Sequence, residues 1–242
     1  MWVGRYTGCF PPSETHMFKT ITPNKKYNHL PNNWSIGCKD RLAHKMRKMK
    51  MAHGKQFNFH PPTYLTPDEM EAVKKAWESG PKNQLWILKP YCFYGGKGIE
   101  VIHQFGQIPL QHRRIAQRYI PNPFLINGYK FDLRVLVLVT SVDPLRVYVY
   151  RDGLVRFATK KFTTRAFDET IHLTNVEVNE KNPDYKLRYS MQTGHKWSFN
   201  KLWEHLKTKD GTDHEPIWEK IKDIALKTII GFYFILNLHF SF

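Results

Sequence analysis

Cysteine is scarce in this sequence of 242 residues. Its three cysteines, Cys9, Cys38 and Cys92, contain no CxxC pair and would leave one unpaired in any disulfide scheme. This usage fits a reducing compartment better than a secreted protein with a disulfide framework. The 12 histidines include no HExxH motif and no zinc-finger spacing, so those two kinds of metal site are excluded.

Long apolar runs are lacking too. The most extended one, residues 229–242, contains Asn237 and His239 and is shorter than the ~20 residues of a membrane-spanning helix. The first residues lack the charged start and apolar stretch of a secretory signal peptide. We interpret 229–242 as a core strand or helix that has lost its continuation, with a tail anchor as the alternative. We expect a cytoplasmic protein without membrane contact.

Acidic residues are fewer than basic ones: the sequence has 21 aspartates and glutamates and 37 lysines and arginines, which gives a formal net charge of +16. Such a charge favours an acidic partner, whether nucleic acid, an anionic membrane or an acidic protein surface. Residues 39–53 carry six of the cations. Apolar Leu42, Met46 and Met49 recur there at helical spacing, which predicts a basic amphipathic helix. Asp40 is its expected N-cap.

A hydrophobic fraction of 41% with 14% aromatic residues is typical of a globular chain. Residues 66–69 are interpreted as a capping box that begins a helix ending near Ser79, and Ser198 is expected to cap another helix. Turns at 143–144 and 152–153 would separate three strands of an antiparallel meander. The pattern predicts a mixed α/β fold of the α+β kind. The predicted strands are 85–90, 99–102, 115–120, 131–140, 146–150 and 154–158, a further helix follows Pro216, and residues 1–36 are expected to be irregular.

One predicted strand carries charge on a single face. Side chains alternate along a strand, so Lys130, Asp132 and Arg134 would point the same way. Two cations and a carboxylate on a strand with a core-facing back suit the binding of a polyanion, and a salt-bridged exposed strand is the alternative. The opposite, core-facing side would consist of Phe131, Leu133, Val135, Val137 and Val139.

A glycine-rich loop at 95–98 lies between two predicted strands and does not match the P-loop pattern GxxxxGK[ST]. A strand–loop–strand flap can still cover phosphates with backbone N–H groups and a lysine. Lys89, at the end of the preceding strand, is a second cation near the same place. The alternative is a plain hairpin turn.

These pieces follow one another along the chain in an order that suits phosphoryl transfer, where positioning and charge neutralisation supply most of the catalysis. The backbone of strand 115–120 would act as a hinge beside an adenine edge. Asp132 would bind a ribose hydroxyl or lie near a metal ion. Arg156 would clamp a carboxylate or form a surface ion pair. Thr174 and Asn175, after another likely strand, would help to bind a nucleotide or form an Asx turn.

With these motifs in this order, the sequence resembles the tubulin-tyrosine-ligase-like amino-acid ligases, from about residue 2 to residue 230. Residues 194–197 and 217–223 look most like the polyglutamylases of that family, its fourth member in particular. The matching segments are WILKP at 86–90, GKGI at 96–99, QRYI at 117–120, KFDLR at 130–134, VTSVDPLR at 139–146, DGLVRFA at 152–158 and HLTN at 172–175.

The resemblance implies an ATP-grasp-like fold of antiparallel sheets with flanking helices. ATP with Mg²⁺ would activate an acceptor glutamate of tubulin as an acyl phosphate, and the amino group of free L-glutamate would attack it. Arg134 and Arg156 would be catalytic, and the incoming glutamate would meet Arg156, Glu177 and Lys196. The positions implied for ATP are Lys89, Gly95, Gly96, Gln117, Arg118, Tyr119, Ile120, Lys130, Phe131, Asp132, Thr174 and Asn175.

The sequence departs from the family pattern in three places. Gly95 replaces a usual arginine of the flap, and Glu177 replaces a serine that contacts the substrate glutamate. The acidic and asparagine ligands of magnesium belong to a later family segment, which this sequence lacks, so no metal ligand is assigned. The expected organisation is an incomplete ligase domain at 1–230, with an N-terminal part to about 83 and a nucleotide-binding part from about 84, followed by a divergent apolar tail at 231–242.

The resemblance implies tubulin or microtubules as partner, through their acidic C-terminal tails, and a place in the cytoplasm on the cytoskeleton, with cilium or basal body as an extension. Two other functions stay open. The chain would be a non-catalytic basic protein that binds microtubules, or a glycine ligase of the same family. The ordered ligase motifs argue against a nucleic-acid binder, although charge alone does not distinguish the two kinds of acidic partner.

Overall fold

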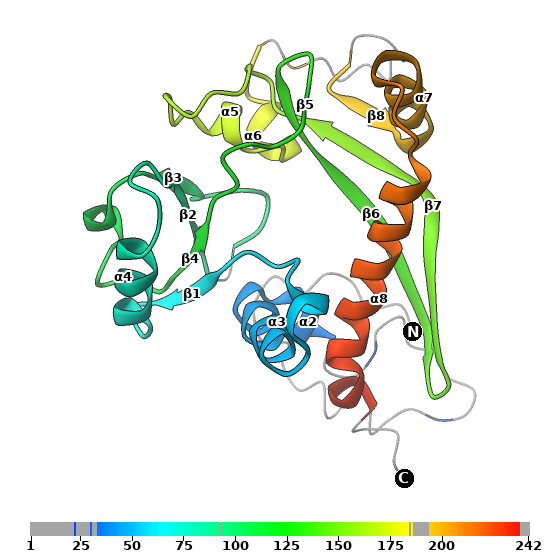
Figure 1. Ribbon diagram of the computed structural model, residues 1–242, viewed down its shortest axis with the longest axis horizontal. Coiled ribbons are helices and arrows are strands. Elements are labelled where there is room, and N and C mark those ends of the chain that lie inside the picture. The colour runs from blue at the N-terminus through cyan, green and yellow to red at the C-terminus, as the bar shows by residue number, and fades with distance from the viewer. Residues whose placement is uncertain are drawn as a thin grey trace. The chain divides into compact units, whose positions relative to one another are not determined.

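The structure is a computed structural model that describes residues 33–91, 93–183, 185 and 194–237, together with residues 22 and 30. The helices are α2 (Trp34–Gly37), α3 (Lys39–His53), α4 (Met70–Glu78), α5 (Glu169–His172), α6 (Val176–Asn179), α7 (Phe199–Asp210) and α8 (Glu215–Asn237) (Figure 1). The strands are β1 (Thr63–Thr66), β2 (Trp86–Pro90), β3 (Glu100–Ile102), β4 (Arg114–Arg118), β5 (Leu125–Ile126), β6 (Tyr129–Val142), β7 (Leu145–Phe157) and β8 (Lys196–Ser198). Two four-stranded sheets, ordered β1-β4-β2-β3 and β5-β6-β7-β8, confirm the predicted α+β class. Most of the segment predicted to be irregular, residues 1–36, lies outside the described residues.

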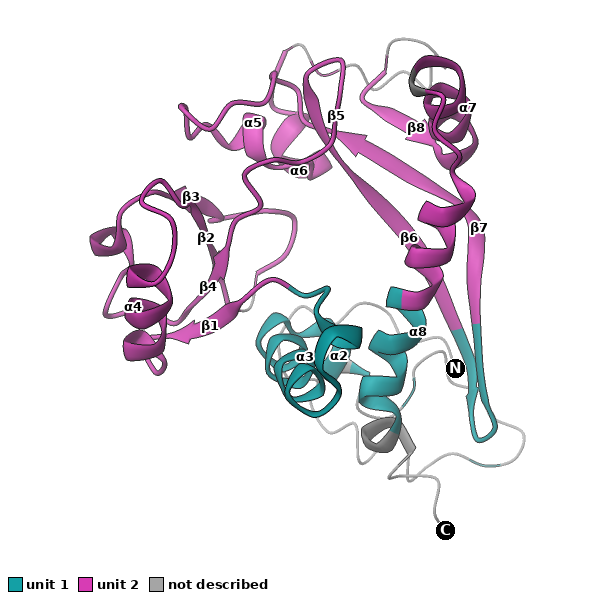
Figure 2. Cartoon of the chain, viewed as in Figure 1, with its two compact units in different colours: residues 1–60, 139–147, 224–242 teal, residues 61–138, 148–223 magenta. Residues whose placement is uncertain are grey.

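The chain forms two compact units (Figure 2). Unit 1 contains residues 1–60, 139–147 and 224–242, and its core joins α3, the tip of the β6–β7 hairpin and α8 through Met46, Val142 and Phe232. Gly231 allows α8 to pack closely on α3, because a methyl group there would lie 2.9 Å from Cε of Met46. The apolar run that begins at 229 is helical as far as it is described, to Asn237, and its Ile229 and Phe232 side chains are buried. None of the described helices has the length and apolar character needed to span a bilayer.

Two predicted helix starts are wrong in detail. The N-cap of α3 is Cys38, and Asp40 lies inside the first turn. The N-cap of α4 is Glu69, and Thr66 belongs to β1, where its hydroxyl donates to the Arg114 carbonyl at 3.2 Å. A threonine held in a strand cannot cap the helix, so the predicted capping box does not form. The predicted end of α4 is correct, since Ser79 is its C-cap.

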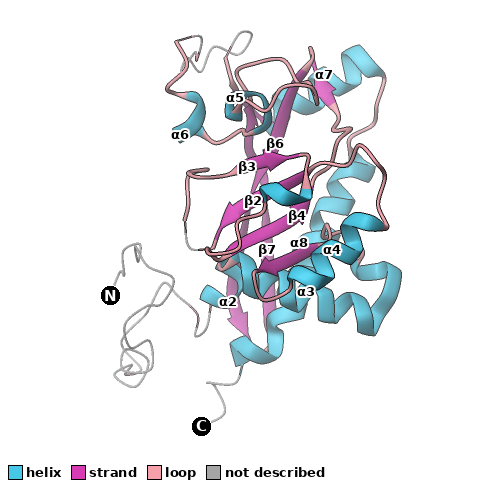
Figure 3. Cartoon of the chain, turned by 90° about the vertical axis from the view of Figure 1, so that its left-hand side faces the viewer, coloured by secondary structure: helices cyan, strands magenta, loops and turns pink. Residues whose placement is uncertain are grey.

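Unit 2 contains residues 61–138 and 148–223, and its first sheet packs against α4 (Figure 3). The sheet is antiparallel: β4 pairs with β1 and β2, and β2 pairs with β3. Trp86 and Leu88 of β2 and Val73 of α4 are almost fully buried in the same cluster. Side chains alternate between the two faces of a strand, so Ile87 and Gln117 point to the face of the sheet opposite α4. That face is available to other elements of unit 2.

The second sheet confirms the predicted alternation along β6 only in part. Phe131, Leu133 and Val135 pack against the buried cluster that includes Val155 and Phe199, whereas Val137 is 39% exposed and was wrongly placed in the core. Ser198 caps α7 as predicted, since its hydroxyl accepts the Lys201 amide at 3.2 Å, and the apolar face of α7 is buried in that cluster.

The turn predicted at 152–153 is wrong, because β7 runs unbroken through both residues. Gly153 is needed for close packing: a methyl group there would lie 2.6 Å from the Arg134 carbonyl oxygen and 2.6 Å from Phe199 Cζ. Asp152 accepts the amides of Gly153 and Phe199 at 2.7 and 2.8 Å. These two residues therefore hold the start of α7 against β7 instead of reversing the chain.

Candidate active site

A chain of hydrogen bonds holds Lys89, the first predicted cation, in place on the paired strands β2 and β4. The Lys89 ammonium donates to Gln117 Oε1 at 2.5 Å, and Gln117 Nε2 donates to the Thr63 hydroxyl at 2.7 Å. Thr63 in turn donates to the Pro61 carbonyl at 2.8 Å. Three strands of the first sheet thereby position Lys89, and Gln117 acts through its side chain, where the sequence predicted a role for its backbone.

The second cation, Lys130, is held by Tyr119 and His172. The Nε2 atom of His172 lies 2.7 Å from the Ala166 carbonyl, which only accepts, so this nitrogen carries the proton. Nδ1 then accepts from the Tyr119 hydroxyl at 2.8 Å, and the Tyr119 oxygen accepts from Lys130 at 2.9 Å. Lys130 also donates to the His172 carbonyl at 2.8 Å. Among the described residues nothing accepts its third N–H, so Lys130 keeps one donor for a ligand.

Burial controls the charge of this group. Removal from water lowers the pKa of Lys130 to about 8; the carboxylate of Asp132 opposes that effect, and the nearby ammonium of Lys89 adds to it. Burial also lowers the pKa of His172 and raises that of Tyr119, which keeps both rings neutral. The ammonium groups of Lys89 and Lys130 repel each other in a site that is partly shielded from water. This arrangement favours an anionic ligand between them.

Asp132 joins β6 to β7 and to the segment before α6. Its carboxylate receives two parallel bonds from Arg156, one from Nε at 2.7 Å and one from Nη2, and a third from the Thr174 hydroxyl at 2.9 Å. The hydrogen bond to Asp132 raises the pKa of the Arg156 guanidinium. Arg156 is therefore engaged with Asp132 through Nε and Nη2, and its other N–H groups are left for the substrate carboxylate that the sequence predicted it would hold.

The glycine loop between β2 and β3 lies against α6. Gly95, Gly96 and Gly98 have positive φ angles of 70°, 82° and 65°, which side chains rarely adopt. A methyl group on Gly96 would lie 2.8 Å from Val178 Cγ2 and 3.0 Å from the Asn175 amide. Arg114 donates to the Gly98 carbonyl at 2.9 Å and holds the other end of the loop. The predicted flap is thus a strand–loop–strand element packed on α6.

The sequence predicts that the flap covers ATP, so Gly96→Ala is expected to weaken ATP binding at least ~tenfold and to lower the free energy of unfolding by about 1–2 kcal/mol. The new methyl group combines strain at positive φ with a steric overlap that pushes the flap off α6. Calorimetric titration with ATP and urea denaturation would measure both. Gly106→Ala is the matched control, since nothing lies within 4 Å of a methyl group there. Equal ATP affinities of the two variants would contradict the role of flap packing.

The loop that carries Thr174 and Asn175 depends on a residue that the sequence did not reveal. Asn179 is fully buried, and its amide accepts from the Thr159 backbone and hydroxyl, each at 2.9 Å. It donates to the carbonyls of Leu173 and Asn175 at 2.8 and 2.9 Å. No local pattern distinguishes this asparagine from one in a turn. The segment before Thr174 was predicted to be a strand, and the structure shows helix α5 there.

Other predicted residues lie farther from these groups. Arg134 is exposed on β6, and Ile120 is 59% exposed just beyond β4. The Phe131 side chain packs on Phe157 with the ring centroids 5.6 Å apart, so only its backbone is available to a ligand. Lys196 lies directly opposite Arg156 in the β7–β8 pairing.

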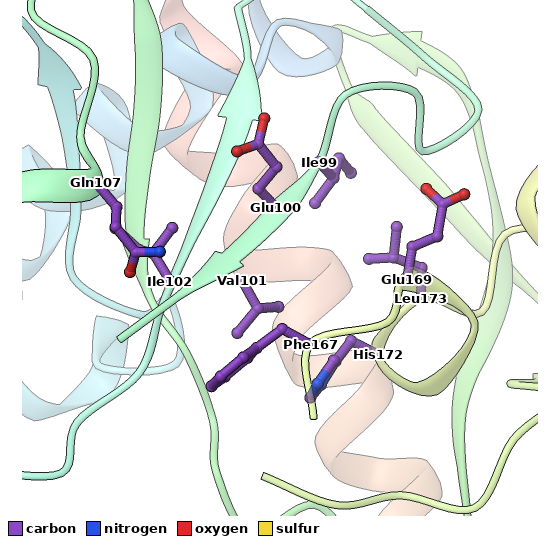
Figure 4. A pocket seen from close by; sticks show the side chains of 9 residues that line it. All are labelled: Ile99, Glu100, Val101, Ile102, Gln107, Phe167, Glu169, His172 and Leu173. Carbon is purple, nitrogen blue, oxygen red and sulfur yellow. The ribbon is translucent and has the colours of Figure 1, made fainter. Parts of the chain in front are cut away.

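A pocket of about 320 Å³ lies between β3 and the α5 region. Figure 4 shows Val101, Phe167 and His172 gathered around it, with Glu100 and Glu169 at its sides. His172 belongs both to this pocket and to the group around Lys130, and Leu173 of the pocket accepts the hydrogen bond from Asn179. Within the described ranges no three His, Cys, Asp or Glu side chains come together in a group that could hold a metal ion.

The family model of the tubulin-tyrosine ligase family matches residues 18–236. The chain belongs to this family. It is 43% identical over 220 residues to human "Tubulin monoglutamylase TTLL4", a match that covers 88% of this chain and 18% of that protein. It is 36% identical over 240 residues to human "Tubulin polyglutamylase TTLL5", covering 96% and 18%. The family fold agrees with the two sheets and flanking helices.

A more distant family member points the same way. The chain is 35% identical over 219 residues to a "Probable beta-tubulin polyglutamylase" of Tetrahymena thermophila, covering 87% of the chain and 18% of that protein. The chain thus spans about a fifth of the length of these relatives. The predicted family is confirmed, and the relatives include both monoglutamylases and polyglutamylases by name.

Proposed function

We propose that this chain forms the nucleotide- and amino-acid-binding part of an ATP-dependent ligase that adds glutamate to glutamate side chains of tubulin. The proposal rests on one observation: hydrogen bonds hold both Lys89 and Lys130 in place, and one N–H of Lys130 is left for an anionic ligand. The relatives named as tubulin glutamylases supply the reaction class.

The residues present fit ATP. Lys89 and Lys130 would neutralise phosphate oxygens, the N–H groups of the flap at 95–98 would cover them, and the chain beyond β4 would lie along the base. When bound, ATP supplies the phosphoryl group that activates the acceptor carboxylate. Among the described residues no group of three His, Cys, Asp or Glu side chains could hold a magnesium ion, and we derive no step through that ion. Asp132 and Thr174 would keep Arg156 oriented toward the incoming amino acid.

The acceptor would be recognised by charge. The chain carries +16, and α3 alone presents six lysines and arginines against one aspartate. Acidic C-terminal tails of tubulin would complement such a surface, and this supports a location on the cytoskeleton. ATP-dependent incorporation of labelled glutamate into tubulin by the 242-residue chain is the direct test. No incorporation at any ATP concentration, with the chain folded, would overturn the ligase assignment for this chain.

The charge on α3 also favours a second candidate function, non-catalytic binding to microtubules. In that case the chain would sediment with polymerised tubulin in a salt-sensitive way, would lose this binding when the acidic tails are removed, and would transfer no glutamate. Sedimentation together with transfer supports the ligase, and sedimentation without transfer supports the second candidate.

ATP binding is expected to weaken by up to about tenfold between pH 7 and pH 9, because the Lys130 ammonium loses its proton as the pH rises through its pKa of about 8. An anionic ligand favours the charged form, so binding near pH 8 should also take up protons. Calorimetry in buffers of different ionisation enthalpy measures both effects. Lys130→Arg, which stays charged, should remove the pH dependence. Equal affinity of the native chain at pH 7 and pH 9 would contradict the role of Lys130.

A further inference from the structure

The carboxylate of Glu177 has no partner of its own beside the candidate active site. Glu177 is an exposed residue of α6, and among the described residues it makes no hydrogen bond and no ion pair within 4.0 Å. A methyl group on Gly95 would lie 3.4 Å from Glu177 Cδ, so the carboxylate lies against the flap. The pKa of Arg156 is raised mainly by its hydrogen bond to Asp132 and also by the charge of Glu177. Glu177 is therefore close to both the flap and Arg156.

Two cations with free N–H groups lie on the neighbouring strands. Arg156 and Lys196 are Cα partners on β7 and β8, and directly paired residues project from the same face of a sheet. Among the described residues Lys196 forms no ion pair. Arg156 uses Nε and one N–H of Nη2 on Asp132, which leaves its remaining N–H groups for a ligand.

The free charges match those of an α-amino acid with an acidic side chain. Glutamate presents two carboxylates and one ammonium group. Arg156 and Lys196 provide two cations for the carboxylates, whereas the charge of Asp132 is already paired with Arg156, from which it accepts two hydrogen bonds in addition to the one from Thr174. Glu177 is the remaining carboxylate near Arg156. Left without a cation, it would repel every acidic ligand of this site.

We propose that Glu177 binds the α-ammonium group of the incoming amino acid and thereby selects amino acids over dicarboxylates of the same length. The inference rests on the proposed function. Glycine suits position 95 because its φ of 70° is one that side chains rarely adopt.

The test compares L-glutamate with glutarate, which has the same two carboxylates and no ammonium group. Calorimetric titrations would use the 242-residue chain in the presence of an ATP analogue with a non-hydrolysable β–γ link. The native chain should bind glutamate about 10- to 100-fold more tightly than glutarate, as expected for a charge-assisted hydrogen bond. Glu177→Gln should reduce this ratio to near one, and Glu177→Asp should retain part of it.

Glu180→Gln is the matched control, because Glu180 is an exposed carboxylate at the end of the same helix and should leave the ratio unchanged. Unchanged affinity for the ATP analogue would show that Glu177→Gln still folds. A ratio in Glu177→Gln equal to that of the native chain would overturn the inference and leave the proposed function standing. A native chain that binds the ATP analogue but neither glutamate nor glutarate would overturn both.

Discussion

In the ligase that we propose, Asp132→Ala is expected to reduce glutamate ligation at least ~100-fold and to lower the free energy of unfolding by about 2 kcal/mol. The substitution removes the acceptor of two Arg156 bonds and of the Thr174 hydroxyl, so a guanidinium that is only 15% exposed loses its counter-charge. Loss of hydrogen bonds to a charged group costs about 1.5–3 kcal/mol, and a misplaced active-site cation costs about 100-fold in rate. Steady-state incorporation of labelled glutamate and urea denaturation measure the two effects.

A double-mutant cycle separates the pair from its surroundings. Arg156→Ala alone should also destabilise the fold, and the double variant should lose less than the sum of the two single losses, because each partner is costly only when the other remains. Asp143→Ala is the control, since Asp143 is an exposed carboxylate in the β6–β7 turn. Additive losses would mean that Asp132 and Arg156 act independently, contrary to their observed pairing.

The positions of the site residues along the chain could be predicted because local patterns determine them. Strict alternation from Lys130 to Arg134 requires a strand with one charged face, and the structure confirms that face for Lys130 and Asp132. A glycine loop between two apolar runs predicted the flap. In each case the signal lies within a few residues, where sterics and burial act directly on neighbours.

Long-range packing explains what the sequence did not reveal. Asp152 and Gly153 resemble a turn, yet Gly153 is there because Phe199 and the β6 backbone approach it closely. Gly95 and Glu177 were predicted separately, one as a position for ATP and the other as a position for the incoming glutamate, and their proximity depends on how the flap meets α6. The engagement of Arg156 by Asp132 is likewise a property of paired strands.

Asn179→Ala is expected to lower the free energy of unfolding by about 3 kcal/mol or more, the largest stability effect that we predict. The fully buried amide makes four hydrogen bonds, and its removal leaves the two Thr159 donors and the Leu173 carbonyl without partners, while the Asn175 carbonyl keeps only its backbone amide donors. Each buried unpaired group costs about 1–3 kcal/mol. Because Asn179 also anchors α6, binding of ATP and glutamate should fall together. Urea denaturation followed by tryptophan fluorescence, with parallel calorimetry, measures these changes.

Asn200→Ala provides the comparison, since Asn200 is exposed on α7 and its removal should change stability by less than about 0.5 kcal/mol. A loss in Asn179→Ala as small as that would show that the four bonds add nothing to the folded state. If stability fell but ligand affinity below the unfolding transition stayed unchanged, Asn179 would stabilise the fold without affecting the binding site. Loss of both would establish that the buried amide positions the loop on which Thr174, Asn175 and Glu177 depend.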